Sequence, residues 1–104
     1  MERKGSQEFF AVLDQVAETH STKSADYGDR GGDPLANIRR GAEMIDVEPW
    51  RACLLRMSDK MQRLKSYCKN GSSKIDGPED DLVDICSYAA LACVMFRESQ
   101  KAKQ

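Results

Sequence analysis

The chain has 104 residues, of which 32% are charged, and its 17 acidic side chains nearly balance its 16 basic ones. This length suits one domain, and the balanced charge argues against a nucleic-acid-binding protein that depends on bulk positive charge. The longest weakly polar run, residues 85–96, is shorter than the roughly 20 residues that cross a bilayer. The basic N-terminal residues precede no apolar segment, so we expect no signal peptide. We therefore expect a single cytoplasmic domain, residues 1–104, with no membrane or nucleic-acid partner.

The four cysteines form no CxxC pair, and all of them fall on predicted apolar helix faces. His20 is the only histidine, so a zinc site with the usual ligand spacing is not expected. The cysteines are better explained as free thiols in the core of a protein from a reducing compartment.

Apolar residues at helical spacing predict a first helix over residues 6–20, with Ser6 as N-cap and His20 at its end. Residues 21–33 have no such periodicity and contain three glycines, which predicts a long loop. This loop contains Lys23, Asp26 and Tyr27. It is either a solvated surface loop or a cover that closes over a planar, charged ligand.

Proline marks the start of three further predicted helices. Asp33 and Pro34 predict a short helix over residues 35–40 that ends at Gly41. A long helix is predicted over residues 49–69, and a second long helix begins at Pro78. The polar residues 98–104 are expected to form a flexible tail.

The last helix carries apolar residues on most of its sides, which is typical of a helix buried in a bundle or at a subunit interface. Its main apolar seam alternates spacings of four and three residues and comprises Leu82, Cys86, Ala89, Cys93 and Phe96. A second stripe at helical spacing comprises Asp81, Asp84 and Tyr88. Since one partner helix covers only one side, we expect a homo-oligomer built through this helix.

The short connection between the two long helices predicts that they are antiparallel neighbours in an all-α fold, a small helical bundle completed by oligomerisation. Counting back from the connection places Arg63 level with Asp84, Asp59 level with Tyr88, and Asp81 level with Ser66. Three carboxylates would then converge, surrounded by the basic side chains of Arg56, Lys60 and Arg63.

This convergence has three interpretations. Carboxylates on facing helices are suited to Mg²⁺, and the basic side chains around them to phosphate oxygens. Alternatively, Arg63 and Asp84 form a buried salt bridge that excludes a metal. Finally, Asp59 lies roughly opposite the apolar seam of its own helix, which is also consistent with a solvated face that carries i, i+4 ion pairs.

The chain resembles small bacteriophage-encoded proteins related to the MazG-like all-α nucleoside-triphosphate pyrophosphohydrolases. The resemblance covers residues 23–98 and depends on Lys23 with Asp26-Tyr27-Gly28, Asp33-Pro34-Leu35-Ala36-Asn37, Pro49-Trp50-Arg51, Arg56, Asp59-Lys60, Arg63-Leu64, Glu79-Asp80, Asp84 and Tyr88. Members of that superfamily bind Mg²⁺ through an ExxE motif and an ExxD motif on consecutive helices. The second motif maps onto Asp81 and Asp84, and the first maps onto Arg56 and Asp59, so an arginine stands in place of one acid.

The resemblance implies a nucleotide-binding protein, and in its enzymatic form a Mg²⁺-dependent pyrophosphohydrolase of the host cell cytoplasm. In that form Asp59 and Asp84 would be catalytic, and Asp59, Asp81 and Asp84 would hold the metal. The expected ligand-binding residues are Lys23, Asp26, Tyr27, Arg56, Lys60, Arg63 and Tyr88. One alternative is a protein that binds or sequesters a nucleotide without hydrolysing it, and another is an oligomeric protein-interaction module without a ligand.

Overall fold

The computed structural model describes residues 3–27, 35–71 and 77–103, and these ranges form four helices and no strand. The helices are α1 (Gln7–Tyr27), α2 (Ala36–Met44), α3 (Pro49–Asn70) and α4 (Pro78–Ala102). The prediction of an all-α protein is therefore confirmed.

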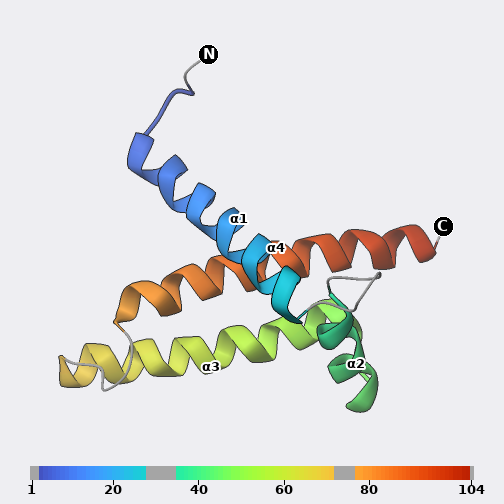
Figure 1. Ribbon diagram of the computed structural model, residues 1–104. Helices are drawn as coiled ribbons and strands as arrows, with labels where there is room; N and C mark the ends of the chain where they lie inside the picture. Colours follow the sequence, from blue (N-terminus) through green and yellow to red (C-terminus); the bar gives the residue numbers. More distant parts are fainter. Residues whose placement is uncertain (1–2, 28–34, 72–76, 104) are drawn as a thin grey trace.

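The two long helices α3 and α4 lie side by side and antiparallel along most of their length (Figure 1). Pro49 and Pro78 occupy the first turns of these helices, as predicted. At the other end of α3, Gly71 has a φ of 72°, and its N–H donates a hydrogen bond of 2.7 Å to the carbonyl of Tyr67. Glycine tolerates this left-handed backbone, so α3 ends one residue after the predicted boundary.

Helix α1 is longer than predicted and continues through residues 21–27, which had been assigned to the loop. It begins as expected, because the N–H of Phe9 donates a hydrogen bond of 3.1 Å to the hydroxyl oxygen of Ser6. Residues 21–27 contain neither glycine nor proline, so nothing in them breaks a helix before Gly28. The rest of the predicted loop, residues 28–33, lies outside the described residues.

Helix α2 also passes its predicted end and includes Gly41. Continuation of the helix buries Ala42, which is 1% exposed, and this burial offsets the roughly 1 kcal/mol that a glycine costs in a helix interior. The helix begins after Leu35, while the predicted cap Asp33 lies outside the described residues. Beyond α2 the chain turns at Asp46, which has a positive φ of 57°.

The core lies where α2 packs against the hairpin of α3 and α4, and its centre is formed by Leu35, Cys53 and Met95. The apolar seam predicted for α4 does not face this core, since Leu82 and Phe96 are 53% and 44% exposed. The inward face instead carries Asp81, Asp84, Tyr88, Leu91 and Met95. The side with acids faces inward because it also carries the core residues Tyr88, Leu91 and Met95, and α3 supplies basic partners for the acids.

Two smaller expectations are also corrected by the packing. Cys53 is buried, but the other three cysteines are exposed rather than part of the core. The expected tail is helical as far as Ala102. Ion pairs hold this end of the chain, from Glu98 to Arg39 at 2.9 Å and from Lys103 to Glu48 at 3.7 Å.

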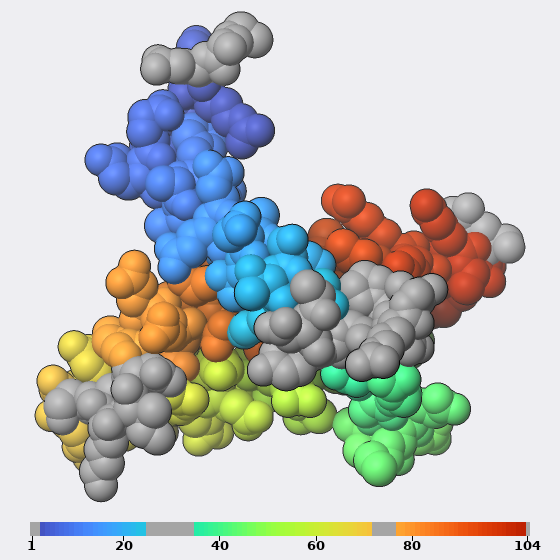
Figure 2. Space-filling model, viewed as in Figure 1, coloured from blue at the N-terminus to red at the C-terminus, as the bar shows by residue number. Residues whose placement is uncertain are grey.

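Helix α1 crosses α4 at a steep angle, and its N-terminal half extends away from the rest of the molecule (Figures 1 and 2). This half exposes the apolar side chains of Phe9, Val12 and Leu13. The C-terminal half of α1 packs on α4 and thereby encloses one side of the site described below. Of the helices described, none combines the length and the apolar character needed to span a membrane.

Candidate functional site

A pocket of about 440 Å³ lies where the C-terminal half of α1 meets α2, α3 and α4. Its volume is within the range of small-molecule sites. Its lining residues are Thr19, His20, Lys23, Ser24, Leu35, Asn37, Ile38, Arg56, Asp84, Ser87, Tyr88 and Leu91. Four of the residues expected from the sequence to form the site are therefore brought together: Lys23, Arg56, Asp84 and Tyr88.

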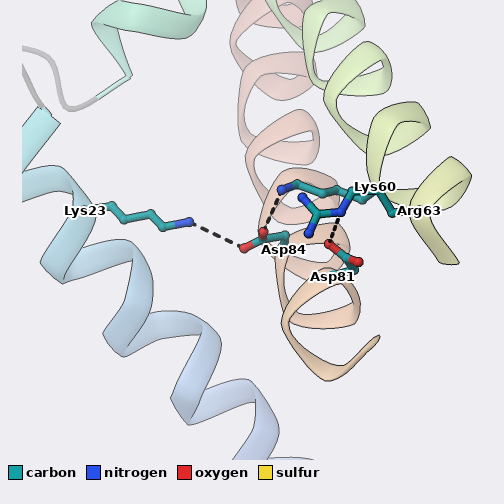
Figure 3. Close-up of polar contacts among 5 residues, drawn as sticks. All are labelled: Lys23, Lys60, Arg63, Asp81 and Asp84. Atoms are coloured by element: carbon teal, nitrogen blue, oxygen red, sulfur yellow. Dashed lines mark hydrogen bonds and ion pairs between the residues drawn. The ribbon is translucent and has the colours of Figure 1, made fainter. Parts of the chain in front are cut away.

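Asp84 links two helices at one side of the pocket (Figure 3). Its Oδ1 atom lies 3.4 Å from Nζ of Lys23 on α1, and its Oδ2 atom lies 3.1 Å from Nζ of Lys60 on α3. The side chain of Asp84 is 19% exposed, so the carboxylate is largely removed from water and gains both cationic partners in exchange. This arrangement fixes two ammonium groups next to the pocket.

A second ion pair lies one helical turn away, where Nε of Arg63 is 3.3 Å from Oδ1 of Asp81 (Figure 3). The Asp81 side chain is only 6% exposed, so it is the more deeply buried carboxylate of the two. The predicted register had placed Arg63 level with Asp84. The observed pairs instead join Arg63 to Asp81 and Lys60 to Asp84, a shift of about one helical turn.

The three carboxylates expected to hold Mg²⁺ do not form a metal site. Within the described residues, no group of three or more His, Cys, Asp or Glu side chains could hold a metal ion. Asp59 is exposed on α3, while Asp81 and Asp84 are each paired with basic side chains. A site with an arginine in place of one acid, and with its remaining buried acids neutralised, does not fit Mg²⁺.

Two polar side chains of the pocket differ from the ion-paired groups described above: the exposed Arg56 and the partly buried Ser87. Arg56 lines the pocket and forms no ion pair within the described part of the chain. The hydroxyl oxygen of Ser87 is buried, and it has no hydrogen-bond partner among the residues that the structure describes. A buried hydroxyl without a partner loses its hydration without compensation, so a ligand atom that reached the Ser87 oxygen would restore the missing hydrogen bond.

Sequence reasoning did not select His20, Asn37 or Ser87 as site residues. His20 had been assigned to a helix end, but α1 continues past it and places it one turn from Lys23 on the pocket side. If the predicted helix had run through residue 27, the three-residue spacing of His20 and Lys23 would have placed both side chains on one face of it. Asn37 belongs to a segment that carries the resemblance, but no signal marks it as a site residue. Nothing in the sequence marks Ser87, since its position at the pocket depends on how the helices pack.

Of the remaining expected residues, Lys60 borders the pocket through Asp84, and Arg63 lies beside Asp81. The side chains of Asp26 and Tyr27 lie outside the described residues, although the backbone of both belongs to α1. The chain matches no protein-family model, and no significant match exists among curated proteins or solved structures.

Proposed function

We propose that this protein binds a phosphorylated small molecule, with nucleotides as the ligand class, in the pocket between α1, α2, α3 and α4. The observation that carries the proposal is that Arg56 and Ser87 line the same pocket. Among the described residues, Arg56 forms no ion pair, and the buried Ser87 hydroxyl has no hydrogen-bond partner. A phosphate group satisfies both, because its oxygens accept hydrogen bonds from guanidinium and hydroxyl groups.

The charge of the pocket supports an anionic ligand. Among the lining residues, Lys23 and Arg56 contribute two positive charges and Asp84 contributes one negative charge, which leaves about one positive charge without an anion. A phosphate monoester carries about −1.5 to −2 charges near neutral pH. The lining therefore has the sign of charge that attracts such an anion, and Lys60 lies nearby as the second partner of Asp84.

The remaining lining supports a ligand with a flat, partly apolar part. Ile38, Tyr88 and Leu91 contribute apolar and aromatic surface, while the amide oxygen of Asn37 accepts a hydrogen bond of 2.8 Å from Arg40. Mostly apolar walls with a few polar groups are typical of small-molecule sites. A nucleotide base has flat faces that the aromatic and apolar part of this lining accommodates.

The resemblance to the MazG-like superfamily also suggests nucleotides, but hydrolysis in that superfamily depends on Mg²⁺. The acids that would bind the metal here are paired with lysine and arginine. We therefore propose binding or sequestration of the nucleotide rather than its hydrolysis.

The test is incubation of the protein with a panel of nucleotides and MgCl₂, followed by mass spectrometry of retained ligand and of products. We expect at least one nucleotide to be retained and none to be hydrolysed. Arg56→Ala should weaken the affinity about tenfold or more, since it removes a charge-assisted hydrogen bond. The matched control is Lys65→Ala, which removes an exposed positive charge of the same helix outside the pocket.

Three outcomes contradict this proposal. Retention of no nucleotide removes binding as the function, and turnover restores the pyrophosphohydrolase hypothesis. Equal affinity losses in the Arg56 and Lys65 variants would mean that the binding reflects general surface charge.

A second candidate function is an oligomeric protein-interaction module. The observation in its favour is the exposed seam of α4, in which Leu82, Cys86, Ala89, Cys93 and Phe96 repeat at spacings of four and three residues. Such a seam is typical of helices that pack against another helix. This candidate gains support if the nucleotide panel gives no retained ligand.

A further inference from the structure

The carboxylates on the inner face of α4 already hold cations that belong to the protein itself. Both oxygens of Asp84 are engaged, Oδ1 by Lys23 at 3.4 Å and Oδ2 by Lys60 at 3.1 Å. In Asp81, Oδ1 lies 3.3 Å from the guanidinium of Arg63. Three helices contribute these groups, and Figure 3 shows the basic side chains converging on α4 from two sides.

A divalent cation would have to displace these groups to bind the same oxygens. Mg²⁺ requires oxygen ligands at about 2.0–2.1 Å in nearly octahedral geometry. The displaced ammonium groups would remain close by on α1 and α3, and their repulsion would oppose a second positive centre. Arg56 at the pocket adds to this repulsion.

The two lysines retain the capacity to bind an anion while they are paired. An ammonium group has three N–H donors, and a hydrogen bond to Asp84 uses one of them. Asp84 thus acts as a positioning residue: it holds Lys23, which lines the pocket, and Lys60 pairs with the other oxygen of the same carboxylate. Together with Arg56, these groups supply the positive charge that metal ions supply in metal-dependent phosphate sites.

We propose that Lys23 and Lys60, held by Asp84, replace divalent cations at this site, so that the pocket binds the phosphate group of its ligand in a metal-free form. This inference rests on the proposed function for its ligand class. It narrows that class to phosphate groups that enter without bound Mg²⁺, such as a monophosphate or an uncomplexed diphosphate. A ligand that exists chiefly as its Mg²⁺ complex would be bound less well.

The first arm of the test examines the metal alone, independently of any nucleotide. MnCl₂ is titrated into the ¹⁵N-labelled full chain, and paramagnetic broadening of the amide resonances is recorded by NMR. At Ser87 and Tyr88 we expect no broadening that the Asp84→Asn substitution would remove. Broadening at these residues that disappears in Asp84→Asn but persists in Asp80→Asn would overturn the inference, because it would show that Asp84 holds a metal.

The second arm uses sodium pyrophosphate as the probe and follows the same amide resonances in EDTA and in MgCl₂. We expect the shifts of Ser87 and Tyr88 in EDTA to give a Kd within about twofold of that in MgCl₂, or a tighter one. A Kd that is tenfold weaker in EDTA overturns the inference.

The two proposals fail in different ways. If pyrophosphate and every nucleotide of the panel leave the spectrum unchanged in both buffers, the proposed function is refuted, and the inference of metal-free binding is refuted with it. If the probe binds only with MgCl₂, the proposed function stands and the metal-free inference alone is refuted.

Discussion

Replacement of Ser87 by alanine is expected to stabilise the ligand-free protein and to weaken ligand binding. The Ser87 hydroxyl oxygen is buried without a hydrogen-bond partner in the described part of the chain. Its removal relieves an uncompensated desolvation cost of about 1–3 kcal/mol. Alanine also has a higher helix propensity than serine, which adds up to about 0.5 kcal/mol.

A gain of 1 kcal/mol raises the Tm of a domain of this size by about 4–8 °C, which calorimetry resolves easily. Ser58→Ala is the matched control, because Ser58 is an exposed serine in the interior of α3 and reports the propensity gain alone. The stability difference between the two variants isolates the contribution of the buried hydroxyl. The same two proteins are then titrated with the nucleotide retained in the panel, where only Ser87→Ala should lose affinity, by about fivefold to tenfold.

The reasoning is refuted if Ser87→Ala is less stable than the parent protein, since the hydroxyl would then have a stabilising partner. It is also refuted if the two alanine variants are equally stabilised, because burial of the hydroxyl would then have no energetic consequence. An unchanged ligand affinity in Ser87→Ala would remove this residue from the binding site.

Three further predictions concern the ion pairs, the pH dependence and the oligomeric state. Asp84→Asn should lower the free energy of unfolding, measured by urea denaturation, by about 1 kcal/mol. This loss is well below the roughly 3–5 kcal/mol of a fully buried pair, because the lysine partners of Asp84 remain partly exposed. A loss above about 3 kcal/mol would contradict this reasoning. The hydrogen bond from Trp50, followed by the charge of Lys103, lowers the pKa of Glu48 from its ordinary value of 4.5. This contribution to stability is therefore present above pH 4.5 and lost as the pH falls through the lowered pKa. The fluorescence of Trp50 should change only below pH 4.5, and a transition centred above that value would be inconsistent with the contact. Light scattering at micromolar concentration should give a dimer or larger oligomer that Phe96→Glu dissociates, whereas a monomeric parent protein would exclude association through α4.

The helices and their order were predictable from local signals. Ser6, Pro49 and Pro78 mark helix starts because a hydroxyl caps free N–H groups and proline fits the first turn. Gly71 ends α3 because it accepts a left-handed backbone. The short connection then requires α3 and α4 to be antiparallel. These effects act within a few residues, so the sequence alone contains them.

Local signals failed where a distant contact outweighed them. Gly41 did not end α2, because the helix gains the burial of Ala42 by continuing. Helix α1 extends to Tyr27, and this extension carries His20 and Lys23 to the pocket. The loop prediction was wrong over residues 21–27, because absent periodicity is weak evidence in a polar segment without glycine or proline.

The sequence by itself determined that α4 has two faces suited to burial: an apolar seam and a stripe that contains acids. It also determined that the acids need basic partners if that stripe is buried. Only the tertiary structure decided which face turns inward. The acidic stripe does so because the same face carries Tyr88, Leu91 and Met95, which pack into the core. Lys23, Lys60 and Arg63 offset the cost of burying Asp84 and Asp81 there. An unpaired buried carboxylate costs several kcal/mol, whereas exposed apolar side chains cost less and can be covered by another molecule. That balance places the charged groups beside the pocket and leaves the apolar seam on the surface.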